Sequence, residues 1–119
     1  MRYICLVHAD PKRFEQLTRE EQQDLDRRSM AYDRELTEKG HYLAAEAIQD
    51  GSTAILVRVR NGAVSTTDGP FIETKEQMAG FILIEAYDMN EALRLAAGIP
   101  MAEMGTIEVR PIYEIPTPP

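Results

Sequence analysis

The sequence has one cysteine and few clustered bases, and each shortage excludes a class of protein. Cys5 has no second cysteine with which to form a disulfide inside the chain. Thirteen basic residues stand against twenty acidic ones, for a net charge of -7, and the longest basic cluster is the pair Arg27-Arg28. Because binding to phosphates needs a concentrated basic surface, no nucleic-acid partner is expected.

Long apolar runs are also missing. The longest, residues 79–86, is too short to cross a bilayer, so no membrane partner is expected. Charge appears already at Arg2, too early for a secretory leader, and the single cysteine fits a reducing compartment. These features predict a cytoplasmic protein. The chain also lacks a phosphate-binding glycine loop, a dinucleotide fingerprint, a Ser-His-Asp order and zinc-ligand spacing, so no cofactor and no metal are expected.

What is present is the composition of one globular domain. The 119 residues are 44% hydrophobic and 28% charged, and a chain of this length buries a core without disulfide or metal support. There is no internal linker or repeat. The sequence therefore predicts a single domain over residues 1–115, followed by a proline-rich tail over residues 116–119.

Two helices are predicted. Thr18 and Glu21 have the spacing of a capping box, and Lys39-Gly40 is a typical helix end, which predicts a helix over residues 18–39. A second helix opens at Asp88 or Asn90 and closes at Gly98. The residues that recur at helical spacing in the first helix are Leu25, Ser29, Tyr32 and Leu36.

Extended segments account for most of the remaining chain. The first is apolar throughout and is predicted to be central and buried on both faces. The segment over residues 54–60 alternates, which predicts one wet face, and Asn61-Gly62 after it predicts a type I′ hairpin. In the last segment Ile107, Val109 and Tyr113 share one face. The predicted strands cover residues 3–7, 42–48, 54–60, 63–67, 81–87 and 107–113.

This order of elements predicts an α+β fold, a ferredoxin-like split βαβ with an extra β-hairpin, in which both helices cover one face of an antiparallel sheet. The other face must also be covered, because Ile55, Val57 and Val59 or their counterparts cannot all face water. A second copy of the chain is the simplest cover. The expected assembly is a homodimer with its sheets face to face.

The segment over residues 67–80 carries the most local information. Asp68-Gly69-Pro70 predicts a turn, since Asp caps backbone groups, Gly accepts any φ and Pro fixes the exit direction. One interpretation is a structural corner with Phe71 plugging the core. The other is that the corner aims Asp68, Glu73 and Lys75 into one pocket, where neighbouring charge and burial would tune their pKa values.

The run Asp68-Gly69-Pro70-Phe71, followed by Glu-Thr-Lys-Glu at residues 73–76 and by Gly80 before the next strand, resembles the DGPF subgroup of the YCII-related family. The resemblance spans nearly the whole chain. It implies a dimeric α+β barrel of ferredoxin-like protomers and an association with extracytoplasmic-function sigma factors.

The wider family also has a His on the first helix and an Asp near that helix's end that have been regarded as a catalytic pair. Ser29 and Glu38 stand at those positions here, so the chemistry of that pair is not expected.

Two further residues are candidates. His8 ends the first strand and could act as a base near neutral pH at the same end of the sheet as the Asp68 corner. Glu46 lies among small residues and is either exposed at the rim or a buried carboxylate with a raised pKa. The complete candidate pocket is Asp68, Gly69, Pro70, Phe71, Glu73, Lys75, His8 and Glu46.

Three functions follow from these features. The first is a homodimer that binds a small molecule or acts as a regulatory module, with a sigma factor as its protein partner. The alternative is a small enzyme without metal that uses Asp68, Glu73 or Glu46 as acid or base, with Lys75 or His8 as charge partner. The third is a purely structural dimer with a filled interior.

Overall fold

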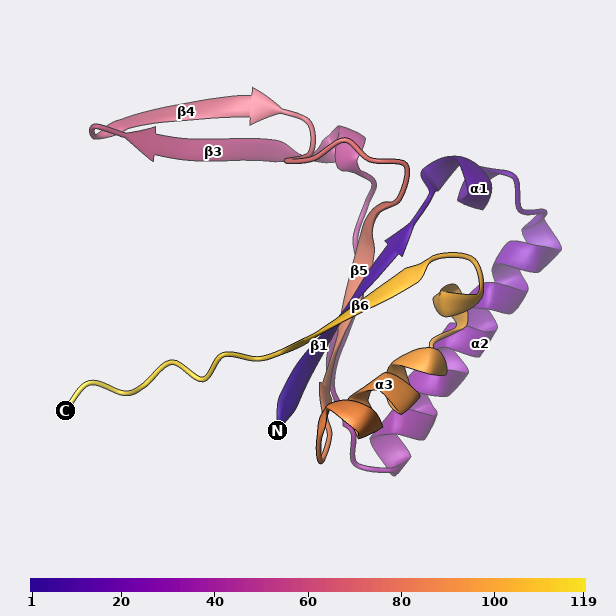
Figure 1. Cartoon of the computed structure of the whole chain (residues 1–119). Helices are drawn as coiled ribbons and strands as arrows, with labels where there is room; N and C mark the ends of the chain where they lie inside the picture. Colours follow the sequence, from indigo (N-terminus) through magenta and orange to yellow (C-terminus); the bar gives the residue numbers. More distant parts are fainter.

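The computed structural model describes all residues, 1–119, and is built around a four-stranded antiparallel sheet with the strand order β2-β5-β1-β6 (Figure 1). β1 pairs with β5 on one side and with β6 on the other, so the prediction that the first strand is central is confirmed. The α+β class and the antiparallel sheet are confirmed as well. The strands are β1 (Arg2–Ala9), β2 (Tyr42–Ala47), β5 (Gln77–Glu85) and β6 (Thr106–Pro111).

The two predicted helices are present, and a third was missed. α2 (Arg19–Glu38) begins with the expected capping box of Thr18 and Glu21, and α3 (Met89–Ala97) is capped by Asp88. The missed helix, α1 (Pro11–Glu15), begins where Asp10 accepts a hydrogen bond from the Lys12 N–H and proline occupies the first helical position. Asp10-Pro11 therefore both ends β1 and begins α1.

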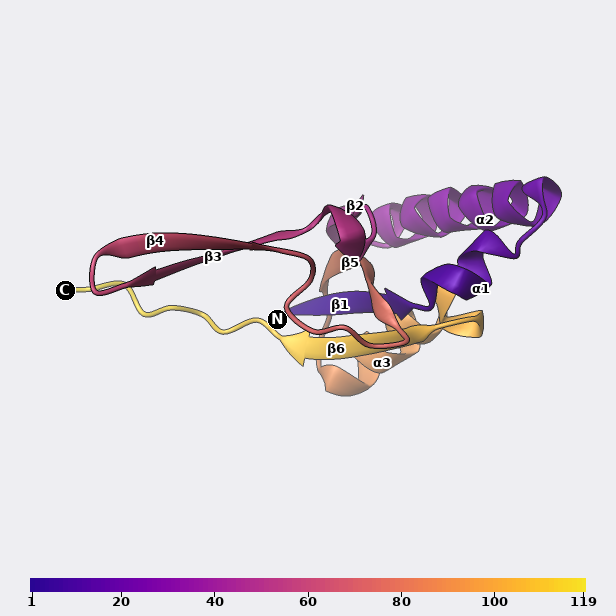
Figure 2. The same ribbon diagram turned by 90° about the horizontal axis from the view of Figure 1, so that it is seen from above.

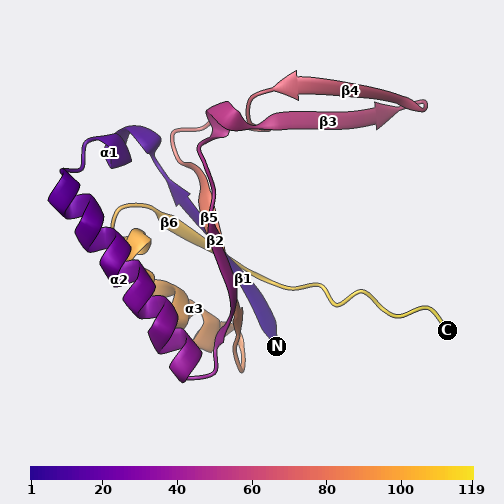
Figure 3. The ribbon, with the colours of Figure 1, turned by 180° about the vertical axis from the view of Figure 1, so that it is seen from behind.

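The core lies between the sheet and the helices. α2 and α3 both cover the same face of the sheet (Figures 1 and 3), the arrangement that the sequence predicted. Alternate residues of β1 point into this core, which leaves the residues between them half-buried on the opposite, open face. The prediction that the first strand is buried on both faces is therefore wrong for the single chain. The core includes Tyr3, Cys5, Val7, Ile82 and Ile84 from the strands and Leu36, Ala92 and Ala96 from the helices.

The hairpin of β3 (Ile55–Arg60) and β4 (Ala63–Asp68) forms a separate two-stranded sheet. Asn61 and Gly62 have φ values of 52° and 77°, which confirms the predicted turn. The hairpin projects from the body on the side away from the helices (Figures 1 and 2). The prediction of one wet face is wrong here, because the strands pair only with each other and Val57 is 65% exposed and Val59 56%. We call residues 55–68 the arm.

The C-terminal strand also ends earlier than predicted. β6 stops at Pro111, and the Ile112 N–H makes a last hydrogen bond to the Arg2 carbonyl. Because β1 begins at Arg2, no backbone remains for later residues to pair with. Tyr113, expected on the buried face with Ile107 and Val109, is therefore exposed.

The chain is flat and extended for its size. It measures 48 × 47 × 19 Å, and its radius of gyration is 16.7 Å, against about 13.5 Å for a compact domain of this length. Its accessible surface is 8694 Å², against about 6,500 Å² for a compact monomer of this mass. The single chain thus exposes roughly 2,000 Å² more than a self-contained domain would.

Candidate functional site

A pocket with a mostly apolar wall, which we call the main pocket, lies between the first two helices and the sheet. It has a volume of about 540 Å³. α1 contributes Phe14, α2 contributes Leu25, and β1, β2 and β5 contribute further residues. The apolar part of the wall includes Val7, Phe14, Leu25, Ile82, Ile99 and Met101.

The charged groups around this pocket are all acidic. No lysine, arginine or histidine lines it. Four of the five acids are exposed, whereas Asp33 on α2 is half-buried. The acids are Glu15, Asp26, Asp33, Glu46 and Asp50.

Asp33 is the chemically distinctive group of the pocket. Its carboxylate has no hydrogen bond or ion pair within the chain, and only its backbone carbonyl is engaged, by the Thr37 hydroxyl at 2.8 Å. Desolvation by burial raises the pKa of Asp33 above its usual value. Asp50 shows the opposite behaviour, because hydrogen bonds from Ser52 occupy its carboxylate and lower its pKa.

The position of Asp33 follows from the periodicity of α2. Asp26, Ser29 and Asp33 are spaced by three and four residues, so they lie on one side of the helix, beside the buried stripe that contains Leu25 and Leu36. Sequence reasoning identified Ser29 but missed Asp26 and Asp33, although their spacing was visible. Helical periodicity shows where the buried side of α2 ends. It does not show the pocket at that edge, because the pocket is also walled by α1, a helix that was not predicted.

Tyr32, next to Asp33, is structural. Its hydroxyl donates a hydrogen bond to the Leu95 carbonyl at 2.5 Å and lies directly against Gly98, where a side chain would collide with it. Burial raises the pKa of Tyr32. Tyr32 therefore packs against the core with its hydroxyl satisfied, and it also lines the pocket.

The Asp-Gly-Pro corner closes the base of the arm. Asp68 is the last residue of β4 and is exposed. Gly69 has a φ of 100° and donates its N–H to the Ala54 carbonyl at 2.8 Å, a conformation that favours glycine. Pro70 packs against Gly51. The corner is thus a turn that holds the two ends of the arm together.

The residues after the corner do not enter the core. Phe71 is 76% exposed, so the interpretation that it plugs the core is wrong, because no element of the single chain covers this loop. Glu73 and Lys75 are also exposed and take part in no ion pair. None of these side chains lines the main pocket. That they meet in a pocket of their own stays a prediction.

His8 lies on the open face of the sheet, away from the main pocket. Its Nε2 atom is 3.0 Å from Glu108 Oε1, and Arg110 donates to the other oxygen of Glu108 at 2.7 Å. The hydrogen bond from Arg110, followed by that from His8, lowers the pKa of Glu108. Glu46, the remaining candidate, lies exposed at the rim of the main pocket, so of its two interpretations the exposed one is observed.

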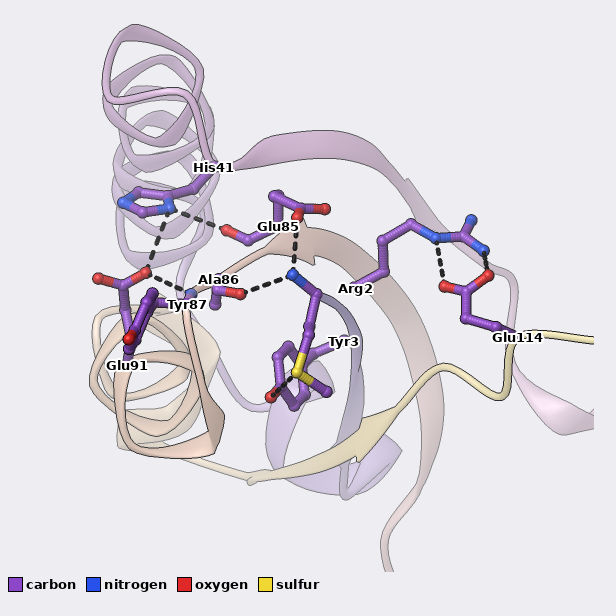
Figure 4. Close-up of polar contacts among 9 residues, drawn as sticks. Arg2, Tyr3, His41, Glu85, Ala86, Tyr87, Glu91 and Glu114 are labelled. Carbon is purple, nitrogen blue, oxygen red and sulfur yellow. Dashed lines mark hydrogen bonds and ion pairs between the residues drawn. The ribbon is translucent and has the colours of Figure 1, made fainter.

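Several other titratable groups have structural partners. His41 Nδ1 lies 2.9 Å from the Glu85 carbonyl and 3.9 Å from Glu91, while the N-terminal amine binds Glu85 Oε1 at 2.7 Å (Figure 4). Burial raises the pKa of Cys5 to about 11, which makes its thiol unreactive near neutral pH. No three side chains of the metal-ligating types gather as a metal ion would need, and no helix is long and apolar enough to span a bilayer.

Two comparisons relate the chain to known proteins. The family model described as "YCII-related domain" matches residues 1–116. The chain is also 32% identical over 114 residues to "Uncharacterized protein R00369" of Rhizobium meliloti (strain 1021), an alignment that covers 94% of this chain and 92% of that protein. The printed name of this relative assigns it no activity.

Proposed function

Since the chain belongs to the YCII-related family, whose matched relative is uncharacterised, we propose that it is a homodimer that binds a small molecule in the pocket between α1, α2 and the sheet. One observation carries this proposal. A pocket of about 540 Å³, walled mostly by apolar side chains, contains a half-buried carboxylate without a partner in the chain. Pockets of this size and composition are typical ligand sites.

The unpartnered carboxylate supports binding over a purely structural role. A charged group that loses water without gaining a partner reduces the stability of the fold. A ligand that offers Asp33 a hydrogen bond or a charge would offset that cost, whereas nothing in the chain does so. The purely structural dimer is the less favoured interpretation for the same reason.

The surface of the single chain supports the homodimer. An excess of roughly 2,000 Å² over a compact monomer is in the range that each subunit of a large, permanent homodimer buries. The open face of the sheet supplies an apolar centre for such an interface. Strand pairing places Ile4 beside Leu83 and Leu6 beside Phe81 on that face.

The arm supports the same arrangement. It projects on the side of the open face, where a second sheet would lie (Figures 1 and 3), and its exposed side chains include Ile55, Val57, Val59 and Val64. In a two-fold dimer the arm would pack along the partner. The strand order and the placement of both helices on one face support ferredoxin-like protomers, and two such sheets packed face to face would form the α+β barrel implied by the DGPF resemblance.

A dye-binding experiment tests the pocket. Ser29 is half-buried in the pocket wall, so Ser29→Phe fills the space, whereas Met30→Phe adds a ring at an exposed position on the same helix. Titration with the neutral apolar dye Nile red should show at least tenfold weaker binding for Ser29→Phe and no change for Met30→Phe. Equal dye binding by the wild-type protein and Ser29→Phe, with both folded by circular dichroism, would overturn the proposal.

Light scattering during size exclusion at micromolar concentration tests the dimer. The expected mass is twice the chain mass of 13.5 kDa. A mass equal to that of one chain would remove the homodimer from the proposal.

A small enzyme that works without metal is a second candidate, favoured by the raised pKa of Asp33 in a pocket. A perturbed carboxylate in a cavity is the usual form of a general acid or base. Ligands identified by thermal shift would be incubated with the wild-type protein and with Asp33→Asn, and their conversion followed by mass spectrometry. Conversion by the wild-type protein alone supports the enzyme, and recovery of intact ligand from both contradicts it.

The association with an extracytoplasmic-function sigma factor stays a prediction. Co-expression of the tagged chain with such a sigma factor, followed by purification in 0.15 M salt, tests it. A stoichiometric complex supports the regulatory function, and a chain that purifies without the sigma factor contradicts it.

A further inference from the structure

We infer that the ligand of the pocket between α1, α2 and the sheet is a small organic cation, an amine or quaternary ammonium on an apolar skeleton, with its charged nitrogen beside Asp33. This inference rests on the proposed function, because it uses the same pocket. It adds the chemical class of the ligand.

The first support is that no basic side chain of the protein neutralises the negative charge of Asp33. Several carboxylates elsewhere in the chain pair with bases, as Glu114 does with Arg2, Glu103 with Arg28 and Glu35 with Lys39. Around the pocket no base is present, and the carboxylate of Asp33 is unpaired. Acidic groups set along low-dielectric walls focus a negative potential into the space between them, which attracts cations and repels anions.

The second support is the wall itself. Besides its aliphatic side chains, the pocket is lined by the aromatic residues Phe14 and Tyr32. Aromatic faces attract alkylammonium groups, and do so more strongly where water is displaced. An apolar skeleton with one cationic nitrogen would use the rings and aliphatic groups for burial and Asp33 for charge.

The same features exclude other classes of ligand. A carboxylate or phosphate ester would meet acidic residues and no base, in a chain whose net charge is already -7. A divalent metal needs several oxygen or nitrogen ligands close together, and no three side chains of those types gather. A neutral apolar molecule would fill the walls but leave Asp33 unpaired.

Calorimetric titration with three matched probes tests the class. Benzyltrimethylammonium carries a permanent positive charge, neopentylbenzene is its neutral carbon isostere, and phenylacetate carries a negative charge. The cation should bind at least tenfold more tightly than the neutral isostere, and phenylacetate should not bind. Asp33→Asn should reduce the affinity for the cation about tenfold and leave that for neopentylbenzene unchanged.

Glu35→Gln is the matched control. It removes one negative charge from the same helix at a position outside the pocket wall, so its affinity for the cation should stay within about twofold of the wild-type protein. Equal affinities for the cation and its isostere, both abolished by Ser29→Phe, would overturn the cation inference and leave the pocket proposal standing. If neither probe binds and Ser29→Phe leaves Nile red binding unchanged, the proposed function fails with it.

Discussion

The two sides of the four-stranded sheet both carry apolar side chains but differ in what covers them. On the helix side Tyr3 and Cys5 of β1 are buried beneath α2 and α3, whereas on the open side Ile4 and Leu6 stay half-exposed. The helix side also leaves an acidic pocket. Alternate residues of the same strand therefore form two apolar surfaces. The helices of the chain cover one of them, and nothing in the chain covers the other.

The largest expected effect is the loss of stability when the core on the helix side is disrupted. Leu36 on α2 is 2% exposed and packs in the core, so Leu36→Ala should lower the free energy of unfolding by about 3 kcal/mol through lost burial and a cavity. Urea unfolding measures it. Leu93→Ala, at a half-exposed position on α3, should change that free energy by less than about 0.5 kcal/mol. Equal losses in the two variants would contradict the assigned core.

The next largest effect is the weakening of the proposed dimer when the open side is changed. Leu6→Asp places a charge at the centre of the proposed interface, so the dissociation constant of the dimer should rise at least about a hundredfold, the loss typical of a central interface residue. Light scattering over a dilution series measures it, with circular dichroism as the check on folding. Met30→Asp, on the exposed side of α2, should leave the dimer intact. A folded Leu6→Asp variant that stays a tight dimer would contradict the interface.

The arm sharpens the comparison, because its apolar side chains are exposed in one chain and proposed to be buried in two. Val57→Ser should weaken the dimer about tenfold, as the loss of a buried aliphatic side chain predicts. The same substitution added to the monomeric Leu6→Asp variant should not change its urea midpoint. A loss of stability in that monomer would show that the arm packs on its own chain.

The corner at the base of the arm gives a smaller effect. Gly69 has a φ of 100°, so Gly69→Ala should cost about 1 kcal/mol of unfolding free energy from backbone strain. Asp68→Ala, at the exposed neighbouring position, should cost less than about 0.5 kcal/mol. The reverse order would favour the interpretation in which the corner aims Asp68 into a pocket.

The smallest effect is the pH dependence of one carboxylate from each side. The pKa of Glu108 on the open side is lowered, so its contribution to stability is present above its unfolded value of 4.5 and is lost as the pH falls through the folded value. The pKa of Asp33 is raised by burial, so stability is lost as the pH rises from 3.8 through the folded value.

Thermal melts from pH 3 to pH 8 test the pair of carboxylates. Asp33→Asn should raise the melting temperature slightly at pH 7, and Glu108→Gln should lower it slightly, because both residues are only half-buried. Below pH 3.5 the differences from the wild-type protein should shrink. A lower melting temperature for Asp33→Asn at pH 7 would contradict its unpaired state.

Most of the body could be predicted from the sequence, because its signals are local. The capping box at Thr18, the turn at Asn61-Gly62 and the alternation of strands each depend on neighbours within a few residues. Burial could not be predicted in the same way. The sequence predicted that Phe71 and the apolar side chains of the arm would be buried, yet they are exposed because no element of the single chain covers them.

The candidate site was predicted less well than the fold. Glu46 was identified and lies at the rim of the pocket, whereas Asp33 was missed because its helical spacing marks only the edge of a buried stripe. The pocket depends on α1, a five-residue helix whose cap and proline were interpreted only as the end of a strand. A site formed by contacts between distant elements is not encoded in the spacing of any one element.

The central claim is that the two sides of the sheet have different occupants, a cationic ligand on the helix side and a second copy of the chain on the open side. A crystal structure of the full chain grown with benzyltrimethylammonium tests both together. The account predicts the ammonium nitrogen within about 5 Å of the Asp33 carboxylate, in cation–π range of the pocket rings, and two open sheet faces packed against each other. An empty pocket beside a sheet face open to solvent would contradict it.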